Sequence, residues 1–169
     1  MDLSPLFFWL ENLPLSQAIK YSAWMFPTIE SLHVVAVALV FGVIAIVDLR
    51  LLGVASRSRR FTEVAQDCLH WTWIAVVLAV ITGVLMFASN ASTYGGNTLF
   101  WWKMALLAVA GVNMAVFEFV TARSVVNWDH PGSVMPMAAR VAGFLSLGLW
   151  MAVIAVGRWI GYTLYALPF

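Results

Sequence analysis

The sequence contains few charged residues and almost no cysteine. Of its 169 residues, 10% are charged and 63% are hydrophobic, and Cys68 is the single cysteine. Soluble domains have ~25% charged and roughly 45–50% apolar residues, so this chain lacks the polar groups to cover a soluble globule. One cysteine excludes an internal disulfide and any cysteine-based zinc or iron–sulfur site. A net charge of +1 without a basic run excludes an extended nucleic-acid-binding surface.

The hydrophobic residues gather in four segments, at about residues 28–49, 70–88, 99–122 and 137–162. Each is long enough to cross a bilayer as a helix, which needs ~20 apolar residues. Strands of a membrane barrel would be about ten residues long with alternating polarity, a pattern that these segments lack. The connections are short, so we predict an all-α, integral membrane four-helix up-down bundle that forms one domain over residues 1–169.

The segment before the first span is predicted to lie on the membrane rather than to cross it. Residues 3–13 are rich in aromatic side chains and are predicted to form a short interfacial helix. Pro14 is expected to end this helix. A second helix is predicted to begin near Gln17, with Ser16 as its cap, and to be kinked by Pro27 where it enters the bilayer.

The Lys and Arg residues are distributed unevenly about the four spans. Six lie in or beside the first and third loops and three lie on the other side: Arg50, Arg57, Arg59, Arg60, Arg123 and Arg140 against Lys20, Lys103 and Arg158. The positive-inside rule therefore predicts that these two loops are cytoplasmic and that both termini are periplasmic, in a bacterial inner membrane.

Three ionisable residues are expected in the periplasmic half of the bundle. Glu30 and His33 are three residues apart, which places them on one face of the first span. Arg158 of the fourth span is expected at a similar depth, where an ion pair with Glu30 would neutralise both charges. Because ionisable groups inside a bilayer are costly, each of the three is a candidate functional residue.

His33 is the strongest candidate ligand. An intramembrane histidine can bind haem iron or copper, carry a proton, or only form a hydrogen bond. His70, the other candidate metal ligand, is predicted at the opposite edge of the bilayer, more than ~15 Å away along the helix axis. A second haem ligand would then be Met86, Met104 or Met151, or His33 of a second copy. The same methionines beside an imidazole also suit copper.

A second polar group is expected in the cytoplasmic half. Asp48 ends the first span, Glu118 lies about one turn from the end of the third, and Asn113 lies deeper. The arginines of the neighbouring loops are near enough in depth to pair with these carboxylates. Asn113 is suited to a hydrogen bond between helices.

Four strings in the chain resemble a bacterial family of small four-helix inner-membrane proteins that contain a domain of unknown function. They are WMFPTIESLH (Trp24–His33), DLRLLG (Asp48–Gly53), TGVLMF (Thr82–Phe87) and GRWIGY (Gly157–Tyr162). The resemblance covers nearly the whole chain and implies a four-helix inner-membrane protein. The start of the first span is more remotely similar to membrane proteins of the cytochrome b and copper-resistance type, which also place a histidine on an apolar helix.

Three functions agree with this pattern. The first is a b-type haem electron-transfer protein or subunit, with His33 as axial ligand and with Glu30 and Arg158 contacting the propionates or a quinone. The second is a small transporter or channel for copper or protons that uses the polar residues above. The third is a structural or assembly subunit of a membrane complex. The expected partners are the lipid bilayer, a second copy or a larger complex, and a quinone or periplasmic redox protein.

Overall fold

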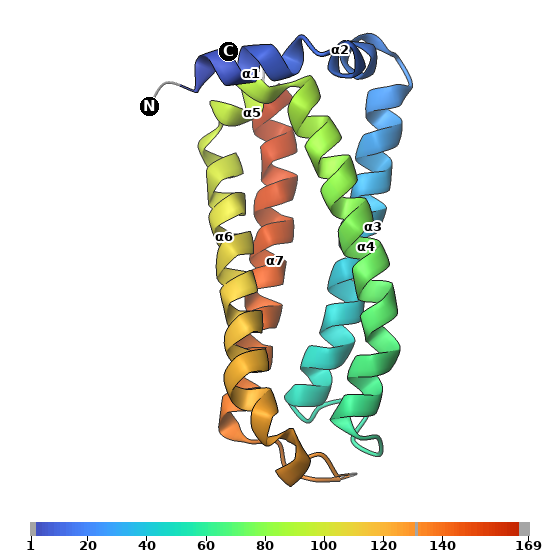
Figure 1. The fold of residues 1–169 in the computed structure, drawn as a ribbon, viewed down its shortest axis with the longest axis vertical. Coiled ribbons are helices and arrows are strands. Elements are labelled where there is room, and N and C mark those ends of the chain that lie inside the picture. Colours follow the sequence, from blue (N-terminus) through green and yellow to red (C-terminus); the bar gives the residue numbers. More distant parts are fainter. Residues whose placement is uncertain (1–2, 131, 166–169) are drawn as a thin grey trace.

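A computed structural model of the chain describes residues 3–130 and 132–165, and four long helices dominate it (Figure 1). They are α3 (Met25–Leu51), α4 (Phe61–Ser89), α6 (Thr98–Val116) and α7 (Met137–Tyr165). A π-turn, η1 (Phe117–Thr121), and a 3-10 segment, η2 (Ala122–Asn127), extend α6. All four are long and apolar enough to cross a membrane, so the prediction of an all-α four-helix membrane bundle is confirmed.

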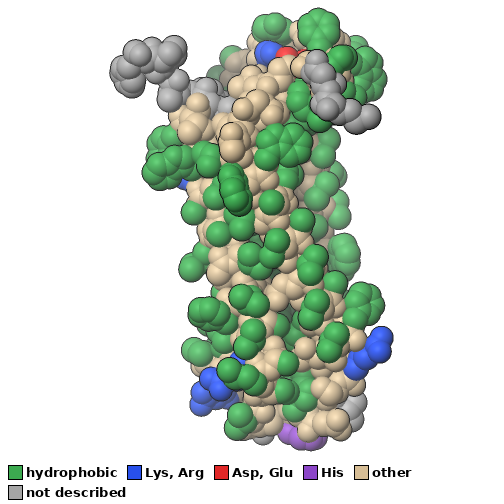
Figure 2. Space-filling model, turned by 90° about the vertical axis from the view of Figure 1, so that its left-hand side faces the viewer, with side chains coloured by type: hydrophobic (Ala, Val, Ile, Leu, Met, Phe, Trp, Pro, Cys, Tyr) green, Lys and Arg blue, Asp and Glu red, His purple; other side chains and the backbone are tan. Residues whose placement is uncertain are grey.

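The outer surface of the bundle is apolar, as lipid requires. Figure 2 shows hydrophobic side chains along the length of the molecule, with Lys and Arg toward its two ends. α4 begins at Phe61 rather than near His70, because its first turns are polar and lie beyond the hydrophobic stretch that marks the span. His70 is therefore well inside a helix and not at its start.

The four helices are arranged as two pairs. α3 packs along α4, α6 packs along α7, and α3 and α7 join the two pairs. Among the described residues, the backbones of α4 and α6 approach each other less closely although the two helices follow one another in the chain, and side chains join them: the Phe87 ring stacks on the Phe100 ring, 5.2 Å between ring centres. We call the contact between α3 and α7 the seam.

Two short helices and α5 (Ala91–Gly95) cover one end of the bundle, here called the cap end (Figure 1). The expected single helix over residues 3–13 is α1 (Ser4–Glu11). The next helix, α2 (Pro14–Tyr21), starts at Pro14 and contains a buried Ser16, so Ser16 is not its cap. The predicted kink at Pro27 is also wrong: the chain breaks after α2, and Pro27 lies in the first turn of α3, where a missing N–H costs nothing.

Glu11 attaches the first helix to the cap end. Its carboxylate accepts hydrogen bonds from the backbone N–H of Ser92, at 2.6 Å, and from the Lys20 ammonium, at 3.3 Å. Burial raises the pKa of Glu11, but these hydrogen bonds outweigh it and hold the pKa below its ordinary value. Beside this contact, the Phe7 ring lies flat against Gly95, where a Cβ would come within 2.3 Å of it.

The substitution Gly95→Ala is expected to release α1 from the cap end, because the added methyl group would overlap the Phe7 ring. Limited proteolysis with trypsin measures this release, since cleavage after Lys20 requires its segment to leave Glu11. We expect faster cleavage in Gly95→Ala than in the wild type. The control is Gly111→Ala, where nothing lies within 4 Å of the added carbon; equal rates in both variants would contradict this packing.

Asp129 ties together the opposite end, here called the loop end. Its buried carboxylate accepts hydrogen bonds from the backbone N–H groups of Phe61 and Thr62 and from the Thr62 hydroxyl. The first turn of a helix has N–H groups without partners in the helix, so a residue from the loop before α7 acts as the N-cap of α4. Below it lies an apolar cluster of Leu51, Phe61, Trp128, Met135 and Ala139.

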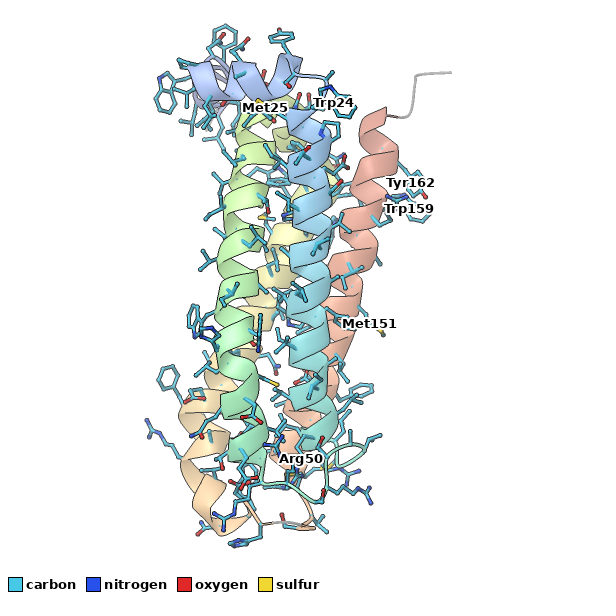
Figure 3. The ribbon with its side chains drawn as sticks, turned by 90° about the vertical axis from the view of Figure 1, so that its right-hand side faces the viewer. Trp24, Met25, Arg50, Met151, Trp159 and Tyr162 are labelled. Carbon is cyan, nitrogen blue, oxygen red and sulfur yellow. The ribbon has the colours of Figure 1, made fainter. Side chains whose placement is uncertain are left out.

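Arg50 of α3 also stabilises the loop end. It is fully buried, and its guanidinium donates from Nε and Nη2 to the carbonyl of Arg59 at 3.0 and 2.9 Å. Figure 3 shows Arg50 between the helices at this end. The predicted pairing of Arg50 with a carboxylate is therefore wrong, because its donors hold the backbone that leads into α4.

Replacing Asp129 by Ala is expected to lower the free energy of unfolding by about 1–2 kcal/mol, because the first amides of α4 would lose their acceptor inside the protein. Thermal unfolding in detergent measures the change. Asp67→Ala is the matched control. Asp67 lies on the exposed surface of α4 and pairs with Arg59, and the loss of such an exposed ion pair should change the free energy of unfolding little. A larger effect at Asp67 than at Asp129 would refute the cap.

Candidate functional site

His33 of α3 faces α4 in the half of the bundle nearer the cap end. Its Nδ1 lies 2.9 Å from the hydroxyl oxygen of Thr82, and the ring passes so close to Gly83 that a Cβ there would be 3.1 Å from Cε1. The glycine thus leaves the space that the imidazole occupies. A Val or Leu at residue 83 would push the ring out of this position.

The hydrogen bonds of Thr82 decide which tautomer His33 adopts. The Thr82 hydroxyl lies 2.6 Å from the carbonyl of Leu78, and a hydroxyl has one proton to donate. The Leu78 carbonyl is the nearest acceptor of this hydroxyl, closer than the Ala79 carbonyl at 3.2 Å, so we assign the proton to Leu78; Thr82 then accepts the His33 hydrogen bond and Nδ1 carries the proton. Nε2 of the neutral ring is then left with a free lone pair, which is the state of a histidine that binds a metal through Nε2.

Lys103 of α6 brings a positive charge to the same part of the bundle. Its side chain runs against Gly157 of α7, where a Cβ would lie 3.5 Å from Nζ, and it is close enough to His33 to interact electrostatically. Among the described residues it forms no ion pair. The site therefore combines a lone pair on His33 with an uncompensated ammonium.

The predicted ion pair between Glu30 and Arg158 is not formed. Glu30 is half-buried, and no ion pair reaches it within the part of the chain that the structure describes. Arg158 points outward and places its guanidinium 5.1 Å from the centre of the Tyr162 ring. Tyr162 lies on the outer side of α7 in Figure 3, so the cation near His33 is Lys103 and not Arg158.

The rotation of each helix decides whether the other candidate ligands face His33 or the outer surface of the bundle. Met151 is 59% exposed and points away from the bundle (Figure 3), so it does not face His33. His70 is exposed and packs against Trp71, 6.1 Å between ring centres. Met86 is half-buried on α4, one turn from Thr82 and on the same helix face. The described residues contain no group of three His, Cys, Asp or Glu side chains that could hold a metal ion.

The predicted inner polar cluster is only partly assembled. Asp48 is buried and faces α7, where the Ser146 hydroxyl is close enough for a hydrogen bond with its carboxyl. Asn113 donates from Nδ2 to the carbonyl of Ala142, one turn from Ser146, at 3.1 Å, which confirms a bridge between α6 and α7. Glu118 is exposed in the π-turn and does not join them.

These positions bear on the transport hypothesis. Glu118 and His70, which would continue a polar path across the membrane, both face outward. Along α3, His33 and Asp48 are separated by about 22 Å of helix. The buried polar groups therefore form two separate layers, one around His33 and one around Asp48. Among the described residues, no continuous line of polar side chains connects the two layers.

Sequence reasoning missed Thr82, Lys103 and Ser146 as parts of these layers. A threonine or serine in an apolar helix usually donates to its own backbone, as Thr72 does, so neither residue type marks a site. Lys103 could have been recognised, because a lysine within a membrane span is energetically costly. Its position near the end of a span, however, is equally typical of a lysine whose side chain extends to the bilayer surface.

Thr82→Val is expected to destabilise the protein by about 1 kcal/mol and to remove the fixed tautomer of His33, because Nδ1 loses its hydroxyl acceptor. Thr72→Val is the matched control: Thr72 makes the same bond to its own helix, to the Cys68 carbonyl, and no other. Nitrogen NMR of labelled histidine reports the tautomer. A wild-type His33 protonated at Nε2 would overturn this assignment.

The chain was compared with known proteins. No curated protein and no solved structure matches it. The family of unknown function DUF6644 matches residues 6–163, which confirms the resemblance to a family with a domain of unknown function. With nearly its whole length matched, the chain belongs to this family.

Proposed function

We propose that the protein is a membrane haem-binding protein for electron transfer, with Nε2 of His33 as an axial ligand of a b-type haem. The observation that carries this proposal is the contact of Nδ1 with the Thr82 hydroxyl, because the tautomer assigned from it places the lone pair of the ring on Nε2. A histidine that binds iron commonly donates its other N–H to an oxygen in this way, since that bond fixes the ring and makes it a better ligand. When bound, haem would supply one-electron chemistry.

The charge at the site favours haem over copper. The Lys103 ammonium would repel a copper ion bound at His33, and no acidic side chain pairs with it within the described part of the chain. The propionates of haem are negative and would neutralise it. Lys103 thus takes the role that the sequence suggested for Arg158, while Glu30, one turn away on α3, is left to contact a quinone or a propionate.

For the second axial ligand we propose Met86. It is half-buried and lies on the face of α4 that contacts His33, and thioether with imidazole is a known haem ligand pair. Met104, beside Lys103, and a second copy of His33 across a homo-oligomer are the alternatives that the sequence leaves open.

We also propose that the cap end faces the periplasm of a bacterial inner membrane. Five exposed arginines lie at or near the loop end: Arg57, Arg59, Arg60, Arg123 and Arg140. Positive charge in short loops marks the cytoplasmic side. The site near His33 is then close to the periplasmic surface, within reach of a periplasmic redox partner.

The test is to purify the protein after expression with added haem precursor and to record oxidised and reduced visible spectra with iron analysis. We expect a haem spectrum in the wild type that is lost in His33→Ala. His70→Ala is the control, since His70 is exposed on the outer surface of α4, and its spectrum should equal that of the wild type. A colourless wild-type protein, or haem kept by His33→Ala and lost by His70→Ala, would overturn the proposal.

A further inference from the structure

Asp48 is a buried acid that the proposed haem site does not use. It lies on α3 about one turn from the loop end and is 5% exposed. It stands at a close approach within the seam, where a Cβ on Gly143 of α7 would lie 3.1 Å from the Asp48 carbonyl oxygen. Its Oδ2 atom is buried and has no hydrogen-bond partner in the part of the chain that the structure describes.

The charged groups around Asp48 do not neutralise it. Arg50, on the same helix, gives its hydrogen bonds to the Arg59 carbonyl. Arg140 of α7 is exposed, and from α4 the buried Cys68 offers only a thiol. The described residues form no ion pair with Asp48, and its hydrogen-bonding neighbour is the hydroxyl of Ser146.

A carboxylate in this place would be an unpaired charge between two helices, which costs several kcal/mol. A neutral carboxylic acid avoids most of that cost. A metal cation is a poorer solution, because Na⁺ or Ca²⁺ requires about six oxygen ligands and the side chains here offer the Asp48 carboxyl and one hydroxyl. The donor set thus fits a proton.

We propose that Asp48 is a proton-binding site, at which Oδ2 carries the proton and exchanges it with water at the loop end. Release of the proton breaks the O–H bond, leaves a carboxylate on Asp48 and transfers the proton to water. The site is separate from that of His33 and needs no haem. Because the seam joins the two helix pairs, we expect its packing to depend on whether this proton is bound.

Infrared spectroscopy of the wild-type protein on a change of pH detects the site directly, through the C=O band of a protonated carboxylic acid. We expect one such band near neutral pH that disappears in Asp48→Asn, which keeps the shape of the neutral acid. Glu118→Gln is the matched control, because Glu118 is an exposed acid on α6's extension. No such band in the wild type, or a band that remains in Asp48→Asn, would overturn the proposal.

Thermal unfolding in detergent provides a second readout that does not depend on spectral assignment. In the unfolded chain an aspartate ionises near pH ~4, whereas the folded seam would still hold the proton at higher pH. The unfolded state then binds fewer protons, so wild-type stability should fall as the pH rises. The fall in stability with rising pH should be smaller in Asp48→Asn than in the wild type and unchanged in Glu118→Gln; equal slopes in all three proteins would contradict a proton on Asp48.

Discussion

The seam between α3 and α7 is the contact on which the rest of the bundle depends. It joins the two helix pairs, and at Gly143 the helices lie so close that an added Cβ would be 3.1 Å from the Asp48 carbonyl oxygen and from the Leu51 Cβ. α3 is covered by α4 on one side and by α7 on the other. Polar side chains of α3 can therefore be hidden from lipid: the half-buried His33 lies against α4, and the buried Asp48 lies against α7. At the two ends of the bundle, Glu11 ties α1 to α5, and Arg50 and Asp129 hold the backbone that leads into α4.

The spacing of the two polar layers limits what they can do together. At an effective dielectric constant of about 20, unit charges ~22 Å apart interact by about 0.8 kcal/mol. A unit charge at His33 would thus change proton binding at Asp48 by about fourfold through the direct electrostatic interaction. Stronger coupling between His33 and Asp48 would require a change in the packing of α3, the helix that carries both residues, in addition to the direct electrostatic interaction.

The spans could be predicted from the sequence because their composition alone requires a bilayer, whereas the rotation of each helix could not. Helices that are apolar all round show no preferred face, so nothing in the sequence indicated that His33 and Asp48 turn inward while His70, Glu118, Met151 and Arg158 turn outward. The error at Pro27 has a local cause, a proline tolerated in the first turn of a helix, whereas the polar start of α4 ahead of the predicted span is held by Asp129 from a distant loop. Long-range caps of this kind leave no pattern near the residues that they bind.

The arrangement of the ends also bears on how a ligand would reach His33. α1, α2 and α5 lie over the cap end, where the Phe7 ring packs against Gly95 and Glu11 holds Ser92, so the direct path from water is covered. On the side of α4 and α6 the helix backbones stand further apart, but the Phe87 ring of α4 stacks on the Phe100 ring of α6, 5.2 Å between ring centres. Side chains therefore close this side as well near the cap end. A ligand from water and a ligand from the bilayer would both have to displace packed side chains, so the path of entry does not discriminate between haem, a quinone and copper. The proposed preference for haem rests on the charge of Lys103.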